Sequence, residues 1–161
     1  MLLFLETSFI CFIMVLACIV GIGSGAEGMV FLYDKKVQER VIELGLTSKE
    51  KIGRNKKNFF LYAVLPCVFL ALLMVYGINK SRGFTQGFIQ LTIIFVGYGL
   101  FDRFFIDGYW VGHTKAWIIP GTEDLMPYID KNAKTRKWIS TLVAYPLICA
   151  LISALINLLI K

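Results

Sequence analysis

The run Phe59–Ile78, FFLYAVLPCVFLALLMVYGI, contains twenty residues and no charged side chain. A helix needs about 20 predominantly apolar residues to cross the hydrocarbon core of a bilayer, which is roughly 30 Å thick. Pro66 lies near the middle of the run, where it predicts a kink and frees a carbonyl for a neighbouring helix to satisfy. This stretch therefore predicts a transmembrane helix.

Three further apolar runs have the length of a transmembrane helix. Thr7–Ala26 also contains twenty residues without a charge, and it lacks the basic segment that begins a signal peptide, so we interpret it as a retained span. Trp138 begins the last run, at the depth where tryptophan anchors a helix to the interface. We predict an all-α integral membrane protein, a single domain over residues 1–161. It is a bundle of four transmembrane helices at residues 7–26, 59–78, 84–101 and 138–160.

The basic side chains are distributed unevenly around these runs. Of the seventeen Lys and Arg residues, eight lie in residues 27–58 and six in residues 102–137. Basic loops mark the cytoplasmic side of a membrane protein. We therefore expect both segments to be cytoplasmic in a multi-pass protein of the cell membrane, with both termini outside. The formal net charge of +6 then favours anionic lipid headgroups as a partner, and not nucleic acid.

The four cysteines lie inside apolar runs and form no C-x-x-C pair. Thiol redox enzymes and cysteine zinc sites need such pairs, so both classes are disfavoured. We interpret Cys11, Cys18, Cys67 and Cys149 as small buried hydrophobic residues.

Small residues recur at intervals of four in the first run, at Ala17, Gly21 and Gly25. This spacing places them on one helix face and lets another helix approach closely. We interpret the face as a helix-packing surface within the chain. A homo-oligomer or a membrane partner protein is the alternative.

The segment between the first two runs is charged and has a helical pattern. Val37, Val41 and Leu44 form an apolar stripe. Gly45 suits the end of this helix, and Thr47 begins a capping box for the next one. We expect an amphipathic cytoplasmic helix that lies on lipid headgroups. A protein partner for the stripe is the alternative.

The stretch Phe101–Tyr128 contains the only histidine, on a loop rich in glycine and proline. Arg103 and Asp107 are four residues apart, so they share one face if the third helix continues past Phe101. An ion pair at a helix end is the structural interpretation of these two residues.

A functional interpretation groups His113 with two carboxylates. Glycine and proline turns can fold the loop back, so that Asp107 or Glu123 holds the tautomer of His113 for general acid–base catalysis. Arg103 and Lys115 are then candidates to bind an anionic group of the substrate.

Trp110 and Trp117 have two interpretations. They are typical of the aromatic belt at headgroup depth. Alternatively the loop dips into the membrane boundary and the two rings line a ligand pocket, with Asp124 as a further candidate contact. Metal binding by His113, Glu123 and Asp124 is disfavoured because their spacing matches no common ligand pattern. The sequence indicates no particular cofactor.

The combination of an aspartate, a tryptophan and the motif IPGTED within residues 102–128 resembles a loop of small four-span membrane proteins of bacteria. The resemblance supports the four-helix architecture and implies no activity.

Two functions follow as hypotheses. The first is a non-enzymatic membrane component that binds a lipid or another lipophilic ligand, or that assists a larger assembly. It requires no special side-chain chemistry. The second is a small interfacial enzyme that acts on a lipid-like substrate through His113 and its carboxylates. A transporter is less favoured, because four spans without an internal repeat need to oligomerise to enclose a path.

Overall fold

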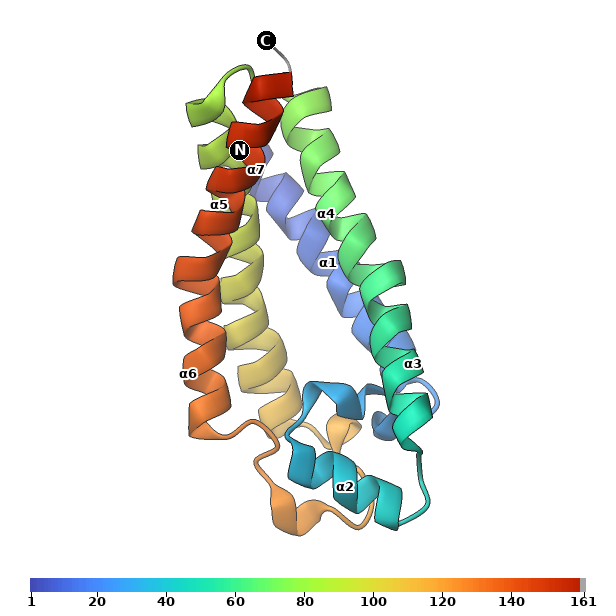
Figure 1. Ribbon diagram of the computed structural model, residues 1–161. Coiled ribbons are helices and arrows are strands. Elements are labelled where there is room, and N and C mark those ends of the chain that lie inside the picture. The colour runs from blue at the N-terminus through green and yellow to red at the C-terminus, as the bar shows by residue number, and fades with distance from the viewer. Residues whose placement is uncertain (160–161) are drawn as a thin grey trace.

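The computed structural model of this chain describes residues 1–159, and this part contains helices and loops without a strand (Figure 1). Four helices in it are long and apolar enough to cross a membrane. They are α1 (Leu2–Ile22); α3 (Lys49–Phe59) continued by η2 (Phe60–Val64), α4 (Leu65–Leu72) and η3 (Leu73–Ile78); α5 (Phe84–Phe101) continued by η4 (Asp102–Val111); and α6 (Lys131–Ile139) continued by η7 (Ser140–Ala144) and α7 (Tyr145–Leu159). The prediction of an all-helical chain with four helices of spanning length is confirmed.

Short elements connect the long helices. They are η1 (Ala26–Leu32), α2 (Lys35–Glu43), η5 (Lys115–Trp117) and η6 (Glu123–Leu125). The first long helix ends at Ile22 and not at Ala26, because the chain turns at Gly25, whose φ of +126° is a conformation that glycine adopts readily. Ile160, the last residue of the predicted fourth run, lies outside the described residues.

The second long helix begins at Lys49, before the apolar run that predicted it. Ser48 caps this helix, with its Oγ accepting a hydrogen bond from the Lys51 N–H at 3.2 Å. The prediction that Thr47 provides the cap was therefore wrong by one position. Gly45 ends the preceding helix as predicted, with a φ of +71°.

The fourth long helix also begins before its apolar run, because Asp130 caps it. The carboxylate accepts a hydrogen bond from the Ala133 N–H at 2.6 Å. The third long helix continues past Phe101 to Val111, as the pairing of Arg103 with Asp107 requires.

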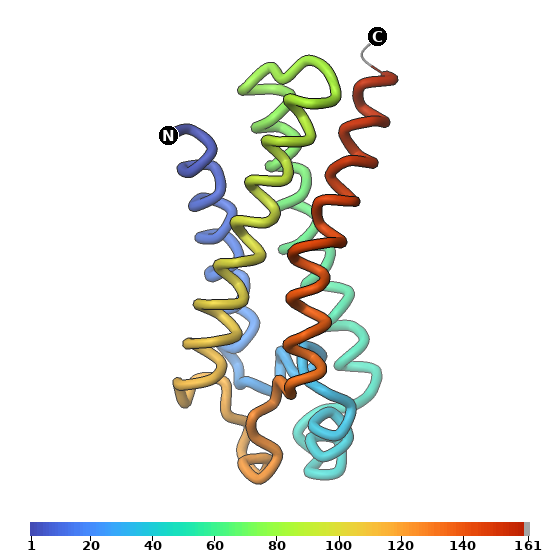
Figure 2. Tube along the Cα trace, turned by 90° about the vertical axis from the view of Figure 1, so that its left-hand side faces the viewer, coloured from blue at the N-terminus to red at the C-terminus, as the bar shows by residue number. Residues whose placement is uncertain are grey.

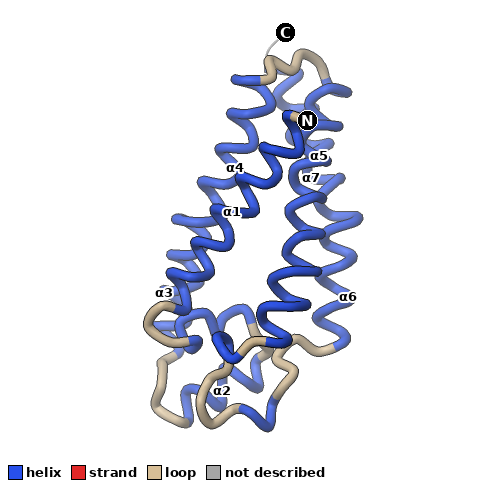
Figure 3. The backbone as a smooth tube through the Cα atoms, turned by 180° about the vertical axis from the view of Figure 1, so that it is seen from behind, coloured by secondary structure: helices blue, strands red, loops and turns tan. Residues whose placement is uncertain are grey.

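In the bundle, α5 lies between α1 and α7, and α1 also contacts α4 (Figure 2). The start of α1, the end of α7 and the turn at residues 79–83 lie at one end of the bundle (Figure 1). Figure 3 shows α2 and the connecting loops gathered at the other end, which we name the loop end. This topology brings residues 27–58 and the stretch after Asp102 together at the loop end.

The loop end has its own hydrophobic core. Val37 and Val41 of α2 are 3% and 0% exposed, and they belong to one buried cluster with Trp117, Ile119 and Tyr128. The loop of the same chain thus covers Val37 and Val41, while Leu44, the third residue of the predicted stripe, is 45% exposed. The expectation that α2 lies on lipid headgroups stays a prediction. The loop supplies large apolar side chains, and burying them against α2 removes apolar area on both sides from water.

A second core lies between the long helices. Its buried members include Ile10, Met14, Ala71, Val75, Leu91, Ile94 and Cys149. All four cysteines are buried, as predicted, and they are free thiols in the structure. The outer surface of the long helices is also apolar, with large exposed side chains such as Phe12, Phe69, Leu151 and Leu155. An apolar outer surface is the property that a bilayer solvent requires.

Candidate functional site

The charged residues after Phe101 form a buried cluster. Arg103 Nη1 lies 2.9 Å from Asp107 Oδ2, which confirms the predicted pair, and the Arg103 guanidinium also contacts Asp102. Lys137 was not among the predicted site residues. Its Nζ lies 2.8 Å from Asp107 Oδ1. The cluster therefore contains two carboxylates and two cations.

This cluster joins η4 to α6 at the loop end. The side chains of Arg103, Asp102 and Asp107 are 8%, 16% and 11% exposed, and that of Lys137 is 30% exposed. Ion pairs this buried stabilise a structure only when each charge keeps its partner. Asp102 and Asp107 already neutralise the charge of the Arg103 guanidinium. The role of Arg103 in binding an anion stays a prediction.

His113 does not meet either of the carboxylates grouped with it. Its ring is exposed, its Nδ1 lies 2.8 Å from the Gly108 carbonyl oxygen, and it stacks on Tyr109 at 6.1 Å between ring centroids. Glu123 instead accepts a hydrogen bond from the Gly121 N–H at 2.9 Å. The acid–base role of His113 with Asp107 or Glu123 stays a prediction. Residues 1–159 contain no group of three or more His, Cys, Asp or Glu side chains that could hold a metal ion.

The two tryptophans of the loop occupy different environments. Trp117 is 0% exposed and packs edge to face on Trp110, with 5.2 Å between ring centroids, while Trp110 is half-buried. Trp117 is therefore a residue of the loop-end core, and its interpretation as part of an exposed aromatic belt is wrong. Lys115 is exposed, and Asp124 pairs with Arg40 of α2 at 3.3 Å across the surface. Their roles in ligand binding stay predictions.

Two buried tyrosines, Tyr33 and Tyr128, form hydrogen bonds with the loop that contains Trp117. The Tyr33 hydroxyl donates to the Trp117 carbonyl oxygen at 3.4 Å, and burial raises the pKa of Tyr33 well above its ordinary value. The Tyr128 hydroxyl accepts from the Ile119 N–H at 3.1 Å and forms a 2.7 Å hydrogen bond with Thr122. These bonds give the irregular backbone of the loop the internal partners that buried polar groups need.

The predicted packing face of α1 contacts η1 of the same chain. A side chain at Gly21 would run into Met29, and one at Gly28 would run into the Gly21 carbonyl oxygen, so the two backbones approach closely there. Gly25 lies past the end of α1. Together with Ala17, these glycines also line a large pocket.

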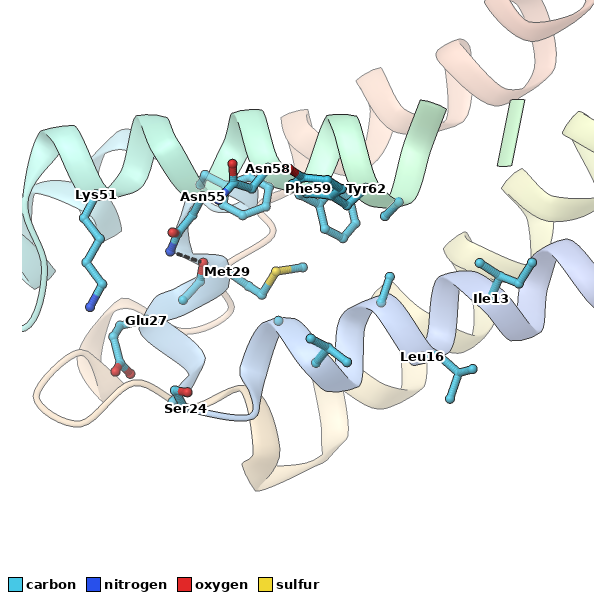
Figure 4. A pocket seen from close by; sticks show the side chains of 17 residues that line it. Ile13, Leu16, Ser24, Glu27, Met29, Lys51, Asn55, Asn58, Phe59 and Tyr62 are labelled. Carbon is cyan, nitrogen blue, oxygen red and sulfur yellow. Dashed lines mark hydrogen bonds between the residues drawn. The ribbon is translucent and has the colours of Figure 1, made fainter. Parts of the chain in front are cut away.

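This pocket is a groove of about 700 Å³ between α1 on one side and α3 with η2 on the other (Figure 4). Its two ends differ in chemistry. One end is apolar, and its walls are Ile13, Leu16, Ala17, Val20, Phe59 and Tyr62. The other end is polar and contains Ser24, Glu27, Lys51, Asn55 and Asn58. We name these the apolar half and the polar half of the groove.

The groove is open along the outer surface of the bundle, since Val20 and Tyr62 are each 79% exposed. Asn55 links two walls of the polar half. Its Nδ2 donates a hydrogen bond to the Gly28 carbonyl oxygen at 3.0 Å and so joins α3 to η1. Figure 4 shows Lys51 and Glu27 together at this end. In the described part of the chain neither takes part in an ion pair, so both charges are available to a ligand.

The groove could not be predicted from the sequence. Its walls come from α1 and from α3 with η2, and no local sequence pattern shows that these segments are neighbours. The Ala17–Gly21–Gly25 spacing marked one wall but not its partner. Comparison of the chain with protein-family models, with curated proteins and with solved structures found no match.

Proposed function

We propose that this protein is a non-enzymatic membrane component that binds one amphipathic lipid in the groove between α1 and α3–η2. One acyl chain of the lipid occupies the apolar half, and the headgroup occupies the polar half. The observation that carries the proposal is the division of a single groove into an apolar half and a polar half.

The size and opening of the groove favour a lipid over a water-soluble ligand. A volume of about 700 Å³ falls within the roughly 300–1,000 Å³ typical of ligand pockets. The apolar walls lie on helices of spanning length and open along the outer surface, so a lipid can enter from the side without leaving the membrane. Because the acyl chain is already in an apolar solvent, its binding depends on close packing in the groove and on the headgroup contacts.

The charges of the polar half favour a zwitterionic headgroup. Lys51 matches a phosphate, Glu27 matches an amine, and the Asn58 amide offers further hydrogen bonds. A headgroup with a phosphate alone leaves the Glu27 carboxylate facing a like charge. A phosphatidylethanolamine headgroup carries both groups and is therefore the preferred ligand.

The placement of the groove in the membrane rests on the basic residues. Fourteen of the seventeen Lys and Arg residues lie in segments 27–58 and 102–137, so we place the loop end on the cytoplasmic side of the cell membrane and both termini outside. The polar half then faces the inner leaflet, where a lipid enters with its headgroup already at the correct depth.

Native mass spectrometry of the protein released from nanodiscs tests this function. The nanodiscs contain phosphatidylethanolamine and phosphatidylglycerol with identical chains. We expect one retained phosphatidylethanolamine per protein. Ala17→Phe lowers retention because its ring occupies the space that the acyl chain needs in the apolar half. Leu151→Phe, on the exposed face of α7 outside the groove, serves as the matched control.

Equal retention by the two variants would contradict the proposal. Equal retention of the two lipids by the unaltered protein would contradict the assignment of the headgroup, and it does not depend on how well either variant folds.

A further inference from the structure

The segments α4 and α7 diverge toward the loop end, which both Figure 1 and Figure 3 show. Near the opposite end η3, which continues α4, is linked to α7 by a hydrogen bond of 3.1 Å from the Tyr76 hydroxyl to Ser153 Oγ. Below this bond lies a cavity of about 310 Å³, which we name the wedge cavity. Its walls include Val64 and Cys67 on one side, Ile148 and Cys149 on the other, and Phe95 behind.

A second, smaller cavity of about 90 Å³ adjoins the wedge cavity, because Met14 and Tyr98 line both. We name it the polar cavity. It is lined by the charged side chains Asp102, Asp107 and Lys137. An apolar cavity and a buried polar one therefore have two wall residues in common.

Trp117 also lines the polar cavity, and it is 0% exposed. Its indole Nε1–H has no hydrogen-bond acceptor among residues 1–159. Buried donors in native proteins nearly always have a partner. This donor therefore requires an acceptor, and the polar cavity that Trp117 lines is the space in which we place it.

The charges around the polar cavity specify what kind of acceptor fits. Asp102 and Asp107 are balanced by Arg103 and Lys137, so the cluster has no net charge. An ionised ligand group adds a buried charge without a partner, which is strongly unfavourable. A hydroxyl group is neutral, accepts a hydrogen bond from Trp117 and donates one to a carboxylate such as that of Asp102.

We propose that the two cavities form a second binding site, separate from the groove, for an uncharged lipophilic molecule that ends in a hydroxyl group. The hydroxyl lies in the polar cavity against Trp117, and the apolar chain lies in the wedge cavity between α4 and α7. The ligand enters sideways through the opening between these two helices, where Ile148 is 50% exposed.

Three probes with the same chain test the site in phosphatidylcholine nanodiscs: dodecan-1-ol, dodecane and dodecanoate. The readout is the rate at which N-ethylmaleimide modifies Cys67 and Cys149, which line the wedge cavity, measured by peptide mass spectrometry. Cys11 lines neither cavity and is the internal control. We expect dodecan-1-ol to protect Cys67 and Cys149 at concentrations about fivefold lower than dodecane or dodecanoate, as one net hydrogen bond predicts.

Trp117→Phe removes the indole N–H and keeps an aromatic ring. We expect this variant to lose the fivefold advantage of dodecan-1-ol over dodecane. Trp110→Phe is the matched control, because Trp110 lines neither cavity.

Three results would overturn the proposal. They are protection of Cys11 to the same degree, equal protection by the three probes in the unaltered protein, and an undiminished preference for dodecan-1-ol in Trp117→Phe. The comparison of the probes uses the unaltered protein, so it decides the question even if Trp117→Phe does not fold.

Discussion

Lys137 binds Asp107 through both carboxylate oxygens: its Nζ lies 2.8 Å from Oδ1 and 2.9 Å from Oδ2. The two residues are thirty positions apart in the chain and come from different long helices. Because Arg103 also contacts this carboxylate, the interaction joins the third and fourth long helices through a shared anion.

Removal of Lys137 tests the contribution of this bond to stability. We expect Lys137→Met to lower the free energy of unfolding by about 1–3 kcal/mol, because it leaves a mostly buried carboxylate with one cation fewer. This is below the roughly 3–5 kcal/mol of fully buried pairs because Lys137 is 30% exposed. Denaturant unfolding in detergent micelles measures the change. Lys134→Met, on the exposed face of the same helix, is the control, and an equal loss in both variants would show that the pair contributes nothing.

The buried phenol of Tyr33 predicts a dependence on alkaline pH. Its pKa is raised above the ordinary value of 10.0 by burial, so above pH 10 the unfolded chain releases this proton and the folded chain keeps it. The unfolded state then binds fewer protons, and the free energy of unfolding falls as pH rises, by about 1.4 kcal/mol per pH unit. Tyr33→Phe removes this slope. The measurement is the difference in unfolding free energy between the two proteins from pH 8 to pH 11, and parallel curves would refute the prediction.

Substitution of Asn55 or Asn58 tests which residue of the polar half stabilises the fold. Asn55→Ala loses the hydrogen bond to the Gly28 carbonyl oxygen, so we expect a loss of about 1 kcal/mol in unfolding free energy. Asn58→Ala breaks no side-chain hydrogen bond found in residues 1–159, so we expect its stability to change by less than about 0.5 kcal/mol. Thermal unfolding of both variants in detergent without added lipid makes the comparison. The reverse order of stability would contradict it.

The charge of Glu27 tests the headgroup assignment. We expect Glu27→Gln to reduce the preference for phosphatidylethanolamine over phosphatidylglycerol about fivefold, because the variant loses the partner of the amine and the repulsion of the phosphate. Competition between the two lipids in native mass spectrometry gives the ratio. Glu43→Gln, on the exposed surface of α2, is expected to keep the original preference. A ratio that both substitutions leave unchanged would exclude Glu27 from headgroup selection.

His113→Ala separates the lipid-binding proposal from the enzymatic hypothesis. The imidazole is exposed and contacts only its own helix end, so we expect unfolding free energy to change by less than about 0.5 kcal/mol and lipid retention to be unchanged. Mass spectrometry of lipids incubated with the unaltered protein and with the variant is the second readout. A lipid product formed by the unaltered protein and missing with His113→Ala would favour the enzymatic hypothesis.

Several features of the fold were predictable because they depend on neighbours in the chain. The charge-free run Phe59–Ile78 predicts a long helix because only a helix satisfies its own backbone in an apolar solvent. The spacing of Arg103 and Asp107 predicts their ion pair because residues four apart share a helix face. Gly45 predicts a helix end for an equally local reason, the left-handed conformation that it adopts.

Other features were missed because they depend on distant segments. The stripe of Val37 and Val41 has the same pattern whether lipid or protein covers it, and here the loop around Trp117 covers it. Tryptophan is a typical interfacial anchor, yet Trp117 is buried in the loop-end core. Lys137 is one of four basic residues between 131 and 137, and only the tertiary structure identifies it as the partner of Asp107.

The sequence by itself determined the number of helices that are long and apolar enough to cross a membrane, and several of the local turns and caps that end them. These properties follow from hydrophobic runs and from hydrogen bonds within a few residues. The tertiary structure alone decided the position of the groove, the neutral cluster around Asp107 and the unpartnered N–H of Trp117 beside it. The physical reason is that a pocket or a buried charge depends on which helices become neighbours, and neighbours are selected by the packing of the whole bundle.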